Sequence, residues 1–95
     1  MEKIFVMNLG TTSFKFKLYQ FQESDYQVLA TGELESIGAQ SSAWQITCPN
    51  DKVLSGSTPI QDHGIAFEHC FGILQSEGVL QDLDDLTAVG YKAVH

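Results

Sequence analysis

Hydrophobic positions in the first part of the chain repeat with the period of a β-strand. Residues 3–7 (KIFVM) form a short apolar run that stops at the sequence NLG, which predicts a buried strand. Residues 13–21 alternate apolar and polar side chains, which predicts a second strand with one face in the core. That face would carry Phe14, Phe16 and Leu18. Residues 26–37 predict a third strand, interrupted by Gly32, and a meander of antiparallel strands is the simplest assembly.

The second half of the chain predicts a hairpin and a final strand. Residues 43–48 and 52–56 flank the sequence Pro-Asn-Asp, whose turn chemistry favours a hairpin. The apolar run 87–94 predicts a last strand that ends almost on the final residue, so we expect the chain to be part of something longer. We expect a mixed α/β (α+β) fold, an incomplete unit with a mixed sheet of about five to six strands and one main helix.

The main helix is expected at residues 62–77, where apolar residues recur at helical spacing. Asp62 is suited to cap its N-terminus, and Gly78 is suited to end it. The carboxylates of residues 82–86 (DLDDL) lack the spacing of a calcium loop, and we interpret them as the solvated start of a further helical turn. The apolar face of the main helix would carry Ala66, Phe67, Cys70, Ile73 and Leu74.

Length and charge exclude some classes of protein. A chain of 95 residues forms one domain at most. Five Lys and Arg against 12 Asp and Glu give a net charge of −7, which argues against a nucleic-acid binder and against a protein of anionic membranes. A phosphate-bearing small molecule stays open, because a local turn and a divalent cation can supply the positive field. With two cysteines and neither a signal peptide nor an apolar run of membrane-spanning length, we expect a cytoplasmic location.

The stretch NLGTTSFK, residues 8–15, carries the first candidate chemistry. A glycine in a tight turn permits backbone conformations that point successive N–H groups into one concavity, and the hydroxyls beside it add donors for a phosphate. Lys15 could reach the same anion, and the amide oxygen of Asn8 could hold a metal ion or its water. The alternative is that Gly10 only makes a hairpin turn, and that Lys15 and Lys17 belong to a solvated strand face.

Histidine and cysteine residues show no pattern of a metal site. His63 and His69 are six residues apart, which places them on different faces of the expected helix and argues against zinc. Cys48 and Cys70 are interpreted as ordinary buried thiols. Trp44 is expected to pack on the core from the hairpin face.

Three blocks of the sequence resemble the acetate kinase family, the short-chain acyl phosphate kinases. IFVMNLGTTSFKFKLY (residues 4–19) is similar to the family's opening, V-L-N-A-G-S-S-S-L-K-F-K-L. LATGELESIG (residues 29–38) is similar to its third strand and the following turn. Residues 62–95 resemble its helix and the segment ending A-V-G-H-R-V-V-H-G-G. The blocks follow the family's order and spacing and cover nearly the whole chain.

The resemblance implies a ribonuclease H-like, actin-like ATPase fold in which two lobes close over a nucleotide. Residues 1–95 would form the N-terminal part of the first lobe, and the second, nucleotide-binding lobe would be absent. The implied reaction is the reversible phosphorylation of a short-chain carboxylate such as acetate, propionate or butyrate, with Mg²⁺ and ATP, to an acyl phosphate. The chain alone would be inactive, and the full-length form could pair as a homodimer.

The family's functional residues carry over at matching positions. Asn8 matches the asparagine near the magnesium, and Lys92 stands where the family has its catalytic arginine. Lysine keeps the charge of arginine but loses the planar fork that grips a carboxylate or phosphate. Leu9 replaces an alanine, and His95 matches a family histidine. The positions that match the family's phosphate loop are Gly10, Thr11, Thr12, Ser13 and Lys15.

Two alternatives remain at this stage. One is a non-catalytic binding or structural module, or a truncated paralogue that keeps the fold, with Lys92 marking the loss of catalysis. The other is a sugar kinase or chaperone-like ATPase with the same strand-turn-strand start, which predicts an aspartate where this chain has Asn8.

Overall fold

The computed structural model describes residues 2–93, which form one six-stranded sheet and one α-helix. The strand order is β5-β4-β3-β2-β1-β6. The first five strands form an antiparallel meander, and β6 returns to lie parallel to β1. The elements are β1 (Glu2–Leu9), β2 (Phe14–Gln22), β3 (Asp25–Leu34), β4 (Ser42–Cys48), η1 (Pro49–Asp51), β5 (Lys52–Thr58), α1 (His63–Ser76), η2 (Leu83–Asp85) and β6 (Ala88–Ala93).

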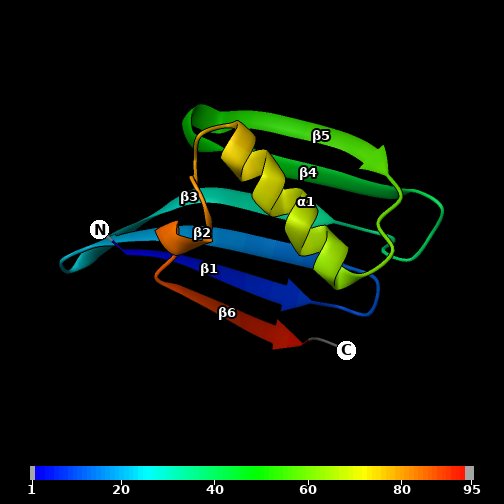
Figure 1. Ribbon diagram of the computed structural model, residues 1–95, viewed down its shortest axis with the longest axis horizontal. Coiled ribbons are helices and arrows are strands. Elements are labelled where there is room, and N and C mark those ends of the chain that lie inside the picture. The colour runs from blue at the N-terminus through cyan, green and yellow to red at the C-terminus, as the bar shows by residue number, and fades with distance from the viewer. Residues whose placement is uncertain (1, 94–95) are drawn as a thin grey trace.

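The helix covers one face of the sheet, and the core lies between them (Figure 1). Alternation in β2 places Phe14, Phe16 and Leu18 on the covered side, where each is almost completely buried. The helix contributes three buried residues: Ala66, Cys70 and Leu74. We call the opposite side of the sheet, where Lys15 and Lys17 lie, the open face.

Gly32 explains the interruption in the third predicted strand. It pairs with Phe16 across β2 and β3, and a Cβ atom at Gly32 would lie 2.1 Å from the Phe16 ring. The same ring stacks on Phe5, with centroids 4.8 Å apart and an angle of 15° between the planes. The missing side chain therefore makes room for an aromatic pair at the centre of the core.

Hydrogen bonds outside the sheet fix the helix and the return to β6. The side chain of Asp62 accepts from the Ile65 amide at 2.9 Å, which confirms it as the N-cap. Lys3 of β1 donates to Asp85 of η2 at 3.1 Å, and the amide of Thr87 donates to the Lys3 carbonyl at 2.8 Å. These contacts tie the segment before β6 to β1, so that the last strand starts beside the first.

The predicted strands, the helix and the Pro-Asn-Asp turn are confirmed, except that the third strand ends at Leu34 and residues 35–37 form part of the following turn. Within η1, Asn50 has a φ of 66°, as turn residues tolerate. Trp44 packs against the core as expected. Residues 94–95, including the end of the predicted last strand and His95, lie outside the described residues. Among residues 2–93 no helix has the length and apolar character needed to cross a membrane.

A pH effect on stability is expected from His69. Its ring lies edge-on to the Trp44 ring, with the ring centroids 4.8 Å apart. Its Nε2 is buried without a hydrogen-bond partner among the described residues. Burial lowers the pKa of His69 from its ordinary value of 6.5. As the pH falls below that value, the unfolded chain takes up a proton that the folded chain resists, so the free energy of unfolding falls.

We therefore expect His69→Phe to lose less stability than the wild type on acidification. At about pH 8 its free energy of unfolding should rise by about 1 kcal/mol, because carbon replaces an unpaired buried nitrogen. Urea unfolding at about pH 8 and about pH 5.5 measures both effects. An equal loss of stability on acidification in the two proteins would contradict this prediction.

Candidate functional site

The turn between β1 and β2 is held by hydrogen bonds from three directions. We call residues 10–13 the 10–13 turn. The amide of Gly10 donates to the Ser13 carbonyl at 3.1 Å, which closes the turn. The amide of Ile37, in the connection after β3, donates to the Thr12 carbonyl at 2.9 Å. Nε2 of His63, the first residue of α1, lies 2.7 Å from the Gly10 carbonyl oxygen and 3.1 Å from that of Ser13.

Gly10 leaves space for the Ser13 hydroxyl and does not supply unusual backbone conformations, which corrects the expectation that the turn needs its conformational freedom. The glycines of residues 2–93 that have a positive φ are Gly38 and Gly78, so Gly10 does not use the left-handed region. A Cβ atom at Gly10 would instead lie 2.3 Å from Oγ of Ser13. The glycine therefore allows the serine hydroxyl to lie directly against the backbone of the turn.

The 10–13 turn has backbone N–H groups that form no hydrogen bond with the described residues. Within residues 2–93, the N–H groups of Thr11, Thr12 and Ser13 have no hydrogen-bond acceptor. The side chains of both threonines are exposed. Consecutive free amides with adjacent hydroxyls are the donor set that suits an anionic oxygen.

Strand register aligns Asn8 with two lysines. Asn8 pairs with Lys15 of β2 on one side and with Lys92 of β6 on the other, and Glu33 of β3 follows Lys15. Paired residues point to the same face of a sheet, so all four side chains lie on the open face. We call these four residues the Asn8 row. All of them are exposed, and Asn8, Lys15 and Glu33 line a shallow depression of about 250 Å³.

The positive charges of the chain are unevenly paired. All five cationic side chains are lysines. Lys3 is paired with Asp85 at 3.1 Å, and Lys52 with Glu77 at 2.6 Å. Within residues 2–93, the other three lysines, all on the open face, form no ion pair. These are Lys15, Lys17 and Lys92. A chain with a net charge of −7 thus presents its unpaired cations around Asn8.

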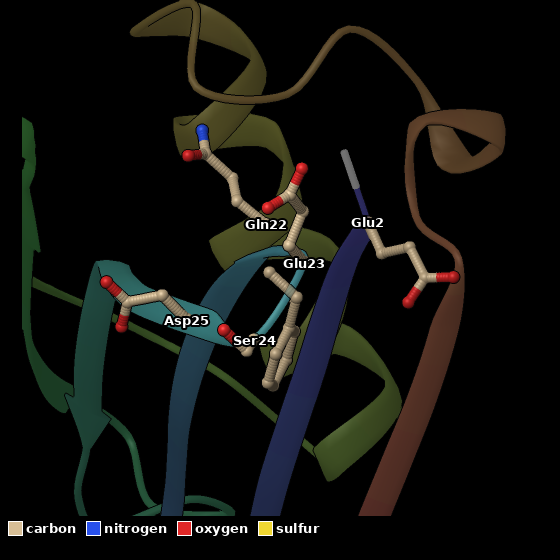
Figure 2. A pocket seen from close by; sticks show the side chains of 6 residues that line it. Glu2, Gln22, Glu23, Ser24 and Asp25 are labelled. Atoms are coloured by element: carbon tan, nitrogen blue, oxygen red, sulfur yellow. The ribbon is translucent and has the colours of Figure 1, made fainter.

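A larger depression lies away from this site, at the turn between β2 and β3. It measures about 890 Å³, and its lining includes Glu2, Glu23 and Asp25. Figure 2 shows that these three carboxylates point in different directions and not toward a common centre. Three negative charges would repel a phosphate, and residues 2–93 contain no cluster of side chains that could hold a metal ion by themselves. We therefore place the candidate site at the 10–13 turn and the Asn8 row.

The remaining candidate side chains fall outside this site. Cys48 and Cys70 are buried and free, as expected, and burial raises the pKa of Cys70 to about 12. Burial also raises the pKa of Cys48, so both stay protonated at neutral pH. Sequence reasoning missed His63: its spacing from His69 argued only against a zinc site, whereas in the structure it contacts the 10–13 turn. No local signal could have shown this contact, because His63 lies 53 positions from Gly10 and 50 from Ser13 in the sequence.

The family model of the acetokinase family matches residues 3–95. The chain belongs to this family. The acetate kinase of Azobacteroides pseudotrichonymphae is 35% identical over 95 residues, which are 98% of this chain and 23% of that protein. The resemblance to the acetate kinase family is thereby confirmed.

Solved structures of acetokinase relatives share the fold. The acetate kinase of Porphyromonas gingivalis superposes with a TM-score of 0.85 at 31% identity, over 100% of this chain and 24% of that one. A propionate kinase of Francisella tularensis superposes with a TM-score of 0.77 at 25% identity, over 100% and 23%. The prediction of a ribonuclease H-like, actin-like ATPase fold is confirmed. The chain spans about a quarter of the length of these relatives.

The contact between Gly10 and Ser13 predicts a non-additive pair of substitutions. Gly10→Ala should lower the free energy of unfolding by about 1 kcal/mol, because its methyl group forces the serine hydroxyl into another rotamer. The same change in a Ser13→Ala background should cost less. Gly72→Ala is the matched control, since a Cβ there meets no atom within 4 Å. Urea unfolding of the variants measures the coupling, and strictly additive effects would contradict the contact.

Proposed function

We propose that this chain is the phosphate-binding part of an acyl phosphate kinase. The complete protein would transfer the terminal phosphoryl group of ATP, with Mg²⁺, to a short-chain carboxylate such as acetate, propionate or butyrate, in a cytoplasmic setting. The observation that carries the proposal is the gathering of unpaired lysines around Asn8, next to a turn with free amides. Membership of the acetokinase family supports the same reaction.

The 10–13 turn and Lys15 would hold phosphate. Phosphoryl transfer depends on positioning and on the neutralisation of charge more than on covalent help from the protein. Gly10 would admit the serine hydroxyl, while Thr11, Thr12 and Ser13 would donate to phosphate oxygens. Lys15 would add positive charge from the adjacent strand.

Asn8 fits a limited role toward magnesium. Its side chain is exposed, and its amide offers one neutral oxygen. Magnesium in kinases keeps several waters and is held by few protein ligands together with substrate phosphates, so one amide suffices as a contact to the ion or to its water. When bound, the ion would neutralise negative charge that develops on the phosphate oxygens.

Lys92 would face the carboxylate or the phosphoryl group in flight. It lies on the open face directly beside Asn8, on the strand parallel to β1. As a point charge it attracts the anion but does not fix the anion's plane as arginine would. This placement favours a catalytic role for Lys92 over a domain that retains the fold only.

A chimera tests the proposed reaction. This chain would replace the matching quarter of the Porphyromonas gingivalis acetate kinase, whose fold it shares. We expect magnesium-dependent formation of an acyl phosphate from ATP and at least one of acetate, propionate and butyrate, trapped as the hydroxamate. The 95-residue chain alone should form none. A chimera that melts cooperatively but transfers no phosphoryl group to any of the three acids would favour a non-catalytic module.

Substitution of Lys92 in that chimera tests its role. Lys92→Arg should raise kcat/KM for the carboxylate about tenfold, because the guanidinium adds a second parallel hydrogen bond to the anion, which is worth about 1.4 kcal/mol. The matched control is Lys17→Arg, which changes the same residue type on the same face but outside the Asn8 row. Steady-state kinetics on the three acids measures both. Equal effects of the two substitutions would remove Lys92 from the site.

A further inference from the structure

His63 links the helix to the 10–13 turn through its side chain alone. The residue is half-buried at the first position of α1, and Nε2 reaches the carbonyl oxygens of Gly10 and Ser13 at 2.7 and 3.1 Å. The helix does not need this side chain for its own N-terminus, because Asp62 already caps it. The contact therefore serves the turn.

The two partners determine the protonation of the ring. Carbonyl oxygens only accept hydrogen bonds, so Nε2 of His63 must carry a proton and donate it to both. In the neutral ring this is the Nε2–H tautomer, with Nδ1 unprotonated. One donor thus spans the two carbonyls that flank the turn.

This donor also orients one free amide of the turn, that of Thr11. In a trans peptide the C=O and N–H groups point in opposite directions, and the described residues contain no cis peptide. Because the Gly10 carbonyl points at His63, the N–H of Thr11 points away from the imidazole and from the helix that carries it. The Ile37 amide acts in the same way on the peptide between Thr12 and Ser13. It donates to the Thr12 carbonyl and so directs the N–H of Ser13 away from Ile37.

We propose that His63 is a positioning residue for the 10–13 turn: its Nε2–H holds the Gly10 and Ser13 carbonyls, which fixes both ends of the turn and keeps the free amide of Thr11 aimed at a phosphate. The role rests on the proposed function, because it assigns the held amide to phosphate. The holding itself is a separate property, and it can be measured without any ligand.

The first test needs only the wild-type chain. The ¹⁵N shifts of the His63 ring should show that Nε2 carries a proton. The opposite tautomer could not donate to either carbonyl and would overturn the proposal, whether or not any variant folds.

The second test compares substitutions at His63. His63→Ala removes the donor, whereas His63→Gln replaces it with an amide of similar reach. Backbone order parameters of residues 10–13 should fall from about 0.85 to below about 0.6 in His63→Ala and recover in His63→Gln. His69→Gln is the matched control on the same helix, because Nε2 of His69 has no partner among the described residues. It should leave the order of the turn unchanged, even if it lowers the melting temperature.

A titration with inorganic phosphate at constant ionic strength separates the two proposals. Amide shifts of residues 10–15 should report binding, and His63→Ala should weaken it about five- to tenfold, with recovery to within about twofold in His63→Gln. If the wild type shows no phosphate shifts while the order of the turn still depends on His63, the positioning role stands and the phosphate assignment fails. If His63→Ala keeps wild-type order and affinity, the positioning role is overturned and phosphate binding stands.

Discussion

The register of β1 between its two neighbours is the constraint on which the site depends. Asn8 meets Lys15 on the antiparallel side and Lys92 on the parallel side, although these lysines are far apart in the sequence. Side chains alternate along a strand, so a slip of one residue in either pairing would move a lysine to the covered face. The apolar alternation of β2 prevents the first slip, because Phe14 and Phe16 must stay under the helix. The hydrogen bond from Thr87 to Lys3 sets where β6 begins and so opposes the second.

The two faces of the sheet carry separate tasks. The covered face holds the aromatic core, where Gly32 gives way to the Phe16 ring, and it supplies the apolar burial that stabilises the fold. The open face carries the unpaired lysines, which stay exposed to solvent because the core on the other face already stabilises the strands. His63 joins the two sides, because it belongs to the helix layer but contacts the turn at which β1 and β2 meet. Packing of the helix against the core and the geometry of the turn are therefore coupled.

Local patterns were sufficient for the elements but not for the contacts between distant segments. The period of two in β2 and the Asp62 cap are properties of neighbouring residues, and both were predicted correctly. The glycine and hydroxyls of residues 8–15 already marked Asn8 and the 10–13 turn as candidates, and the resemblance to the acetate kinase family supported them. A mixed sheet was predicted, but no sequence pattern showed that β6 lies parallel to β1, because this depends on where η2 attaches to Lys3. His63 was missed for the same reason, and the role of Gly10 was misread because the space beside it is decided by the rotamer of Ser13.

The amide at position 8 has a further consequence for the electrostatics of the row. Directly paired residues on one sheet face have Cβ atoms about 5 Å apart, close enough for opposite charges to attract each other strongly. An aspartate between Lys15 and Lys92 would pair with both and cancel much of their field, leaving Glu33 to offset the remainder. The neutral Asn8 keeps an oxygen and an N–H donor at this point and adds no second carboxylate to Glu33, which already lies beside Lys15. The row thus attracts negatively charged ligands even in a chain with a net charge of −7, which an aspartate at the same position would oppose.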